Sequence, residues 1–297
     1  MELGINLSFA LKRWPEPERW AAIVDERLGL RSIQFTLDLI DAWWPQAERS
    51  ALARSAKAAA DAHGIAIHSA QIGLAGYTYN GLLHPEKAAR SVARDWWGRS
   101  IELAAELGAG AAGGPLGALS AADAADPARR DSLYAELLEH IHKLADQAMR
   151  QGLSALLVEP TPLPREIPST IAQTEQLLAD CAGTAVPLQL VIDVGHALYR
   201  PLYGDGVTLE QWLRPLAAQI GVLHLQNHDF RSDAHWGWPD VRGSYDPREL
   251  VRDASACGLT GVPVFIELFF PFEQDDAEVL ALVESSVAAC SSAIPSR

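Results

Sequence analysis

Four short apolar runs in the second half of the chain each end in a residue type that binds metal ions. Each run is rich in aliphatic and β-branched residues, as expected of a strand that is covered on both faces. The four runs are Leu156–Glu159, Leu190–Asp193, Val222–His224 and Val264–Glu267. If they are neighbouring parallel strands of a barrel, their terminal side chains meet at the edge where barrel enzymes place their chemistry.

The donor atoms of these four terminal residues indicate which ion they would bind. Three carboxylates and one imidazole suit Mn²⁺, Mg²⁺ or Co²⁺ better than a structural zinc, which usually recruits thiolates. We therefore predict one divalent metal ion, held by Glu159, Asp193, His224 and Glu267. Such an ion acts as a Lewis acid on a carbonyl and stabilises the enediolate that forms when an α-proton is lost. A carboxylate in or beside the ligand set can serve as the base.

The loops after Asp193 and His224, which follow the sixth and seventh of eight predicted strands, carry further polar residues. His196 follows Asp193 by three residues and can reach back to the same site. Period-two alternation sends Gln226 to the same strand face as His224. The seventh loop continues through Arg231 to the D-x-H pair of Asp233 and His235, which can bind a second metal ion or hold a sugar hydroxyl.

Two tryptophans are placed where they could contact a substrate. Trp14 lies in the first predicted loop and Trp236 in the seventh, and either ring could stack on a sugar or close the mouth of the site. The apolar segment 269–272 after Glu267 could line the pocket or join two copies of the chain. We expect a homo-oligomer.

Strand and helix signals alternate along the whole chain, which favours a parallel sheet with helical crossovers. The other predicted strands are Leu3–Leu7, Ser32–Thr36, Ile65–Ser69 and Ala109–Ala112. Amphipathic stretches predict eight helices, at Glu18–Arg27, Arg49–His63, Ala88–Leu107, Asp131–Gln151, Ser169–Cys181, Leu209–Leu216, Asp246–Cys257 and Asp276–Cys290. The Ala-rich stretch Leu116–Asp126 is interpreted as a loop.

Glycines stand where several predicted helices must stop, at Gly29, Gly64, Gly108, Gly152 and Gly258. No GxGxxG follows the first strand, as it would in a doubly wound dinucleotide-binding fold. Eight βα units in a chain of this length instead predict a single (β/α)8 TIM-barrel domain over residues 1–297 of the α/β class.

The composition limits the possible partners. The 297 residues carry a net charge of −14, which disfavours nucleic acid and anionic membranes as partners. The three cysteines form no CxxC pair, and no run approaches the length of a membrane span. We expect a cytoplasmic protein without disulfides.

The ordered ligand set resembles the xylose isomerase-like TIM-barrel superfamily of sugar isomerases and epimerases, which also includes endonuclease IV. The resemblance is carried by Glu159 in VEPT, Asp193 and His196 in IDVGH, His224 in LHLQN and Glu267 in FIEL. In the ketose 3-epimerases of this group, Glu, Asp, His and Glu hold one divalent metal, and the two Glu exchange the proton.

The resemblance implies roles for particular residues of this chain. Glu159 and Glu267 would be both metal ligands and the acid/base pair, and His196 would contact substrate. Those epimerases usually place an Arg soon after the strand-seven His, where this chain has His228 and Asp229, so Arg231 is the candidate for that role.

The third loop and the turn after the fourth strand look similar to members that handle four- or five-carbon substrates, including erythrulose phosphate 3-epimerases and the apiose isomerase type. On this finer resemblance His68 is a candidate substrate contact. The predicted substrate is a small sugar or sugar phosphate, which places the enzyme in carbohydrate metabolism. We also expect the seventh-loop residues Gln226, His235 and Trp236 to contact it.

Two chemistries fit this prediction, aldose–ketose isomerisation and epimerisation of a ketose at C3. The alternative from another class is a metal-dependent phosphoesterase or an endonuclease IV-like hydrolase. Hydrolysis of that kind prefers two or more metal ions a few Å apart, so a count of bound metal ions separates the two readings.

Overall fold

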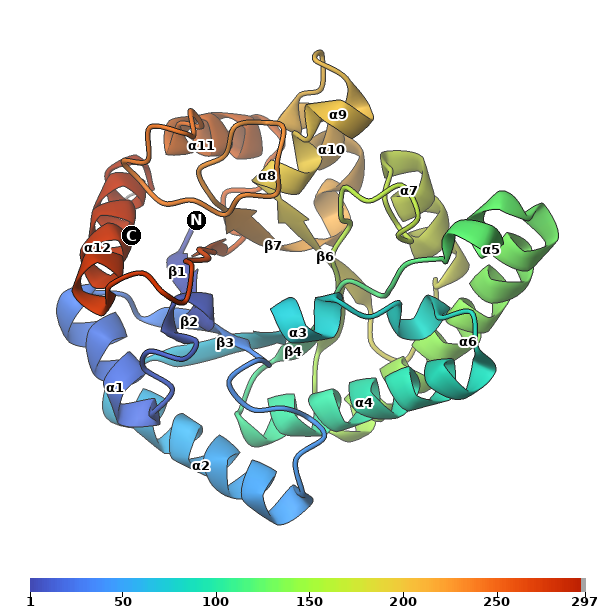
Figure 1. The fold of residues 1–297 in the computed structure, drawn as a ribbon, viewed down its shortest axis with the longest axis horizontal. Coiled ribbons are helices and arrows are strands. Elements are labelled where there is room, and N and C mark those ends of the chain that lie inside the picture. The colour runs from blue at the N-terminus through green and yellow to red at the C-terminus, as the bar shows by residue number, and fades with distance from the viewer. Residues whose placement is uncertain (295–297) are drawn as a thin grey trace. The chain divides into compact units, whose positions relative to one another are not determined.

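Eight parallel strands close into a barrel, with helices between consecutive strands, so the predicted (β/α)8 fold is confirmed (Figure 1). The computed structural model describes residues 1–294. The strands are β1 (Leu3–Asn6), β2 (Ser32–Thr36), β3 (Ala66–Gln71), β4 (Ala111–Gly114), β5 (Ala155–Val158), β6 (Leu188–Asp193), β7 (Ile220–Leu225) and β8 (Val264–Ile266). The prediction of one domain over residues 1–297 stays a prediction, and its last three residues lie outside the described part.

The longer helices match the predicted ones to within a few residues at each end. They are α1 (Pro17–Ala22), α2 (Gln46–Ala62), α4 (Lys87–Glu106), α6 (Pro127–Arg150), α7 (Ile171–Asp180), α10 (Leu209–Leu216), α11 (Pro247–Ala256) and α12 (Asp276–Ala293). The five glycines predicted to stop helices all have positive φ, between 64° and 83°. Glycine adopts this left-handed conformation without the steric cost that a Cβ would add.

Short helical segments were not predicted, because one turn is too short to show a periodic pattern. The π-helical turn η2 (Ile23–Arg27) is not one of them, because it continues α1 and falls within the helix predicted at Glu18–Arg27. The unpredicted segments are α3 (Leu74–Tyr77), α5 (Ala121–Ala125), α8 (Val194–Ala197), α9 (Arg200–Tyr203) and the 3₁₀ turns η1 (Leu7–Ala10), η3 (Gly81–Leu83) and η4 (Ala217–Gln219). The interpretation of Leu116–Asp126 as a loop was therefore wrong for α5, where the Ser120 side chain caps the turn by accepting from the Asp123 N–H.

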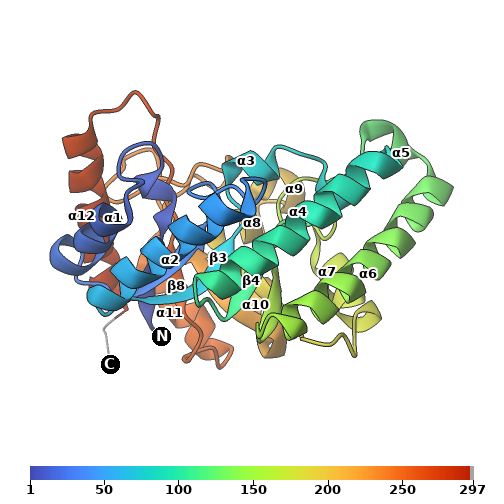
Figure 2. The ribbon, with the colours of Figure 1, turned by 90° about the horizontal axis from the view of Figure 1, so that it is seen from below.

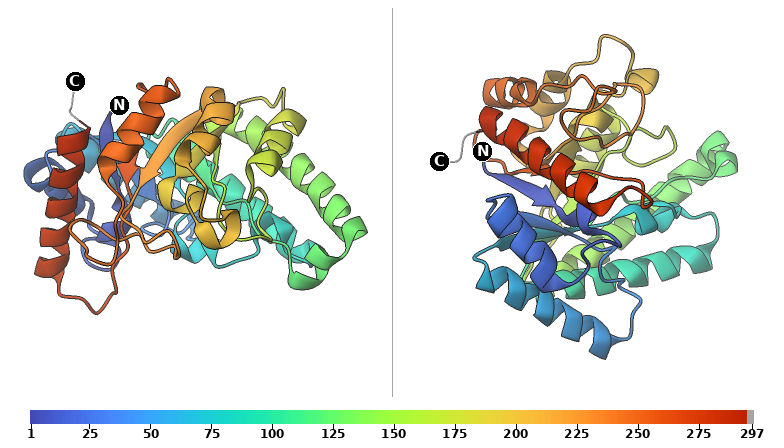
Figure 3. Two further views of the ribbon diagram at one scale, coloured as in Figure 1. Left: turned by 90° about the horizontal axis from the view of Figure 1, so that it is seen from above. Right: turned by 60° about the vertical axis from the view of Figure 1, so that its left-hand side comes forward.

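Two compact units make up the chain, and the first comprises Met1–Phe35, Ala58–Ile67 and the residues from Val191 onward. In this unit β1 pairs with both β2 and β8, and Ile5 lies in register with Ile33 and Ile266. All three isoleucines are fully buried. Figure 3 shows α12 beside α11 on the outside of this unit. The buried apolar rows supply the hydrophobic stabilisation that holds the strand ends in place.

The second unit comprises Thr36–Lys57 and His68–Leu190 and contains β4, β5 and most of β3. In it the helices α4 and α6 lie side by side (Figure 2). Gly113 of β4 is paired with Leu157 of β5, and a Cβ on Gly113 would lie only 1.9 Å from the Leu157 carbonyl oxygen. The close approach explains why β4 is made of Ala and Gly, and why its sequence signal is weak.

Helices in the described residues are all too short or too polar to cross a bilayer.

Candidate metal and acid–base site

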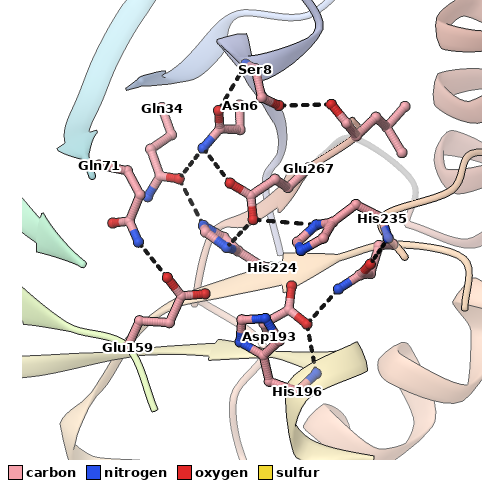
Figure 4. A network of polar contacts seen from close by, with 12 residues as sticks. Asn6, Ser8, Gln34, Gln71, Glu159, Asp193, His196, His224, His235 and Glu267 are labelled. Carbon is pink, nitrogen blue, oxygen red and sulfur yellow. Dashed lines mark hydrogen bonds and ion pairs between the residues drawn. The ribbon is translucent and has the colours of Figure 1, made fainter. Parts of the chain in front are cut away.

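Three of the four predicted ligands come together within the first unit. Asp193 is the last residue of β6, His224 lies near the end of β7, and Glu267 directly follows β8. One ligand atom of each lies within 4.8 Å of the others. Figure 4 labels the three side chains within one network of polar contacts. All three are almost inaccessible to solvent. Buried charged and polar groups at one point require partners, and a cation is one partner that would satisfy all three.

His224 and Glu267 form a close ion pair in this group. His224 Nδ1 lies 2.9 Å from Glu267 Oε2. Burial alone would raise the pKa of Glu267, but the charge and hydrogen bond of His224 and the charge of His235 lower it below its ordinary value. Glu267 is therefore a carboxylate at neutral pH, as both a metal ligand and a general base must be.

Asp193 is held by hydrogen bonds to one oxygen only. Its Oδ1 accepts from the His196 backbone N–H at 2.9 Å and from Gln226 Nε2 at 2.8 Å. Burial would raise the pKa of Asp193, but the neighbouring imidazoles of His196 and His235 outweigh burial and lower it. Its Oδ2 is buried and accepts no hydrogen bond from any described residue. A buried carboxylate oxygen of this kind is suited to coordinate a cation.

Gln226 was predicted to contact substrate, but both ends of its amide are used inside the protein. Its Nε2 donates to Asp193, and its Oε1 accepts from the backbone N–H of His235. The amide lies against Gly195, where a Cβ would stand 2.5 Å from Gln226 Nε2. Glycine at 195 thus makes room for the side chain that orients Asp193.

The predicted D-x-H pair forms a second polar group in the first unit. Asp233 Oδ1 lies 3.0 Å from His196 Nε2 and 2.9 Å from His235 Nε2, so one carboxylate links both imidazoles. His235 Nδ1 faces Glu267 Oε2 at 3.6 Å. Burial would lower the pKa of His235, but Asp233 and Glu267 raise it to about 9. Asp193, His196 and His235 also meet the geometric requirement for a metal site.

His235 reaches this position through an unusual backbone. Its φ is 46°, which is uncommon for a residue with a Cβ and costs on the order of 1 kcal/mol. Paired backbone hydrogen bonds between Asn227 and Trp236, at 2.9 and 3.1 Å, close the loop and hold the conformation.

Two amides, one at the end of β1 and one in the middle of β2, belong to the same network and were missed from the sequence. Asn6 Nδ2 donates to Gln34 Oε1 at 2.8 Å and to Glu267 Oε1 at 3.0 Å. Gln34 Oε1 lies 2.7 Å from His224 Nε2. Both amides are buried. A polar amide within a predicted buried strand was the available signal, because such a group needs hydrogen-bond partners.

The fourth predicted ligand lies in the second unit. Glu159 directly follows β5 and is 5% exposed, and its Oε2 accepts from Gln71 Nε2 at 2.7 Å. Gln71 was missed because β3 was predicted to end at Ser69 and in fact continues to Gln71. Strand alternation places His68 on the face of β3 opposite to Gln71, so the strand lends no support to the predicted substrate contact of His68.

Three other predicted substrate contacts lie outside the network of Figure 4. Arg231 is exposed, with Asp205 3.8 Å away. Trp14 is half-buried and its ring lies 6.1 Å from that of Phe9. Trp236 is half-buried, with the Arg242 guanidinium over its ring. Their roles toward a substrate stay predictions.

The residues present fit a divalent cation. Octahedral coordination with bonds of about 2.1 Å separates adjacent ligand atoms by about 3 Å, close to the 2.9 Å between His224 Nδ1 and Glu267 Oε2. Oxygen and imidazole donors suit Mg²⁺, Mn²⁺ or Co²⁺. Asp193 Oδ2 is a further buried oxygen that could coordinate the cation, because it accepts no hydrogen bond from any of the described residues.

Comparison with known proteins places this geometry in context. The family described as Xylose isomerase-like TIM barrel matches residues 24–284. The D-erythrulose 1-phosphate 3-epimerase of Brucella abortus (strain 2308) is 24% identical over 294 residues, which cover 97% of this chain and 94% of that protein.

Two solved structures are similar to this protein over almost the whole chain. A protein of Rhodospirillum rubrum ATCC 11170, provisionally assigned as a xylose isomerase, is 40% identical with a TM-score of 0.96, over 99% of this chain and 100% of that one. A D-psicose 3-epimerase crystallised in the presence of D-fructose covers 100% of both chains with a TM-score of 0.73. Since it is only 18% identical, this second likeness bears on the fold alone.

Proposed function

Because the chain belongs to the xylose isomerase-like TIM-barrel family, we propose that it is a divalent-metal-dependent epimerase that acts at C3 of a small ketose or ketose phosphate. The curated relative from Brucella abortus is named for this reaction type on a four-carbon ketose phosphate, which supports the proposal. A substrate of four or five carbons, with or without phosphate, is the class we propose.

The observation that carries the proposal is the buried carboxylate–imidazole group of Asp193, His224 and Glu267, whose ligand atoms lie within 4.8 Å of one another. We assign these three as metal ligands and propose Glu159, which directly follows β5, as the fourth. When bound, a divalent cation polarises the substrate carbonyl and stabilises negative charge on the adjacent oxygens.

The protein's own contribution is proton transfer by two glutamates whose orientation is fixed. Asn6 and His224 each hold one oxygen of Glu267, and Gln71 holds Glu159. In the proposed reaction one glutamate removes the proton from C3 and the other glutamate returns a proton to the opposite face. The two roles exchange in the reverse direction, as microscopic reversibility requires.

The imidazoles beside this group have a different proposed task. We assign His196 and His235 to substrate hydroxyls, because Asp233 holds Nε2 of both rings and so fixes their orientation. A rigid pair of polar groups contributes to catalysis by orienting the reacting carbon toward the glutamates.

Solvent isotope exchange tests the reaction. The metal-loaded protein is incubated in D₂O with ketotetroses, ketopentoses and their 1-phosphates, and the recovered sugar is analysed by NMR. We expect deuterium at C3 together with the C3 epimer. Deuterium at C2 of an aldose would instead identify aldose–ketose isomerisation. Turnover without any label on carbon would refute proton abstraction.

Variants of the two glutamates test their roles. Glu159→Gln and Glu267→Gln should each lower kcat by roughly 10² or more, the range typical of a lost acid/base group. The exposed Glu273→Gln is the matched control and should keep full activity. Because both glutamates are also proposed ligands, metal content is measured in each variant. Wild-type turnover in a metal-loaded variant would remove that residue from the acid/base pair.

A second candidate function rests on the group formed by Asp193, His196 and His235. If this group held a second ion, the site would have the two-metal arrangement of phosphoester hydrolases. The net charge of −14 opposes binding of nucleic acid, so a small phosphoester would be the substrate. Two equivalents of metal per chain, together with phosphodiester cleavage and no sugar turnover, would favour this candidate.

A further inference from the structure

The geometry assigns Asn6 as a positioning residue that determines which nitrogen of His224 faces the metal. The inference rests on the metal-binding part of the proposed function and deepens it. It concerns only residues of the first unit, on or directly after β1, β2, β7 and β8. Figure 4 shows the chain of contacts that runs from Ser8 through Asn6 and Gln34 to His224.

The backbone determines the orientation of the Asn6 amide. Asn6 caps the η1 turn, and its Oδ1 accepts from the backbone N–H of Ser8 at 2.9 Å. Ser8 is itself anchored, since its hydroxyl donates to the Leu268 carbonyl at 2.9 Å. A flipped amide would point Nδ2 at the Ser8 N–H and bring Oδ1 against two acceptor oxygens. Its Nδ2 must therefore point toward Gln34 and Glu267.

Both hydrogens of the Asn6 amide are used at this point. They go to Gln34 Oε1 at 2.8 Å and to Glu267 Oε1 at 3.0 Å. The first contact identifies the Gln34 atom as the oxygen, because two amide nitrogens would repel at that distance. Asn6 thus positions one metal-ligand candidate directly and a second through Gln34.

The orientation of Gln34 then determines the tautomer of His224. Gln34 Oε1 can only accept, so His224 Nε2, at 2.7 Å, carries the hydrogen. When His224 ligates an ion, Nδ1 is therefore the nitrogen left to offer its lone pair, and it lies 2.9 Å from Glu267 Oε2. A lone pair and a carboxylate oxygen attract each other at that distance only through a shared proton or a shared cation. The hydrogen bonds from Ser8 to His224 therefore leave His224 Nδ1 and Glu267 Oε2 directed toward one ion.

Local order of this kind is what tunes the affinity of metal sites. A ligating imidazole is usually held through its second nitrogen, and loss of such a partner weakens metal binding about 10- to 100-fold. Here the partner of His224 is the Gln34 amide, which does not titrate. Its orientation is set by Asn6, which is itself oriented by the backbone N–H of Ser8. Position 6 therefore requires a hydrogen-bond donor toward Gln34 and Glu267, whereas position 34 requires a hydrogen-bond acceptor for His224.

Paired amide-to-acid substitutions test this difference. Mn²⁺ affinity is measured by calorimetry on the full-length protein for Asn6→Asp, Asn6→Ala, Gln34→Glu and Gln34→Leu. Asn6→Ala removes the donor and should weaken binding about 10- to 100-fold. Asn6→Asp replaces the donor by an acceptor beside Glu267 and should weaken it at least as much. Gln34→Glu keeps an acceptor for His224 and should bind Mn²⁺ more tightly than Gln34→Leu by about tenfold.

A spectroscopic measurement separates orientation from general stability. In the Mg²⁺-loaded wild type, ¹⁵N NMR of the His224 ring should show the hydrogen on Nε2, and in Asn6→Asp this signature should be lost or mixed. The exposed Gln46→Glu is the matched control, and it should change neither affinity nor spectrum. Thermal unfolding of each variant checks that the fold is retained.

The outcomes distinguish the inference from the proposed function. If the wild type binds no divalent ion, both fail. If the wild type binds Mn²⁺ and the Asn6 variants bind it equally well with an unchanged ring signature, the role of Asn6 is refuted and the proposed function stands. Equal losses in Gln34→Glu and Gln34→Leu would refute the requirement for an acceptor at position 34.

Discussion

Substituting Gly195 by alanine should disturb the proposed metal site through a single misplaced methyl group. Gly195 lies in α8 and is not among the residues with positive φ, so its backbone can accept a Cβ. The surrounding side chains leave no room for that Cβ, because it would stand 2.5 Å from Gln226 Nε2 and 3.2 Å from Asp193 Oδ1. The buried Gln226 side chain has to move, and its 2.8 Å hydrogen bond to Asp193 is lost.

The magnitude follows from the two opposing effects. Alanine in place of glycine favours a helix by up to about 1 kcal/mol. A hydrogen bond to a charged group contributes about 1.5–3 kcal/mol, and the displaced amide also leaves the His235 N–H without its acceptor. We expect a net loss of about 1–3 kcal/mol in the free energy of unfolding and a lower Tm. Loss of the residue that orients Asp193 should weaken Mn²⁺ binding by about 10- to 100-fold.

Calorimetric titration with Mn²⁺ and denaturant unfolding measure these two effects. Gly206→Ala is the matched control, because no heavy atom lies within 4 Å of a Cβ at that position and its φ is not positive. A double-mutant cycle with Gln226→Ala identifies the mechanism. Once Gln226 is truncated, Gly195→Ala should cost little more, which gives a coupling energy well above 0.5 kcal/mol. Additive effects within about 0.5 kcal/mol would refute the proposed clash.

Two further predictions concern metal removal and pH. Chelation by EDTA should lower Tm and abolish turnover. Free Mn²⁺ at 100 times its Kd should then restore about 2.7 kcal/mol to the free energy of unfolding. A Tm that does not respond to Mn²⁺ would contradict an ion site in the folded protein. Burial lowers the pKa of His228 to about 4, so the unfolded chain takes up this proton first as the pH falls below the ordinary value near 6.5. The folded state should therefore lose about 3 kcal/mol between pH 6.5 and 4 on account of this group. His228→Asn should remove that part of the pH dependence and the exposed His142→Asn should not, whereas parallel stability curves for wild type and His228→Asn would contradict the assignment.

The fold was predictable because its signals are local. Each strand of the second half is an apolar run of a few residues, most long helices show a periodic apolar face, and several of them end at a glycine. The errors fell on elements whose signals are weak for a physical reason. β4 is built of small residues because its backbone lies close to that of β5, and one-turn helices such as α5 carry no periodicity.

The candidate ligands were likewise visible in the sequence, since a chemically distinctive residue at the end of an apolar run stands out. Their supporting amides were not visible. Asn6, Gln34 and Gln71 are ordinary polar residues in their local context, and the sequence around Gln226 predicts a substrate contact instead. What distinguishes them is the partner that each one meets.

The sequence by itself thus determined the order of the elements and the type of chemistry, because hydrophobic periodicity and donor type are properties of short segments. The tertiary structure alone decided which amide holds which ligand. Asn6 meets Glu267 across 261 positions of the chain, Gln34 meets His224 across 190, and Gln71 meets Glu159 across 88. Hydrogen bonds act only over about 3 Å and in one direction. Such pairings therefore depend on the register of strands in the barrel, which no local pattern records.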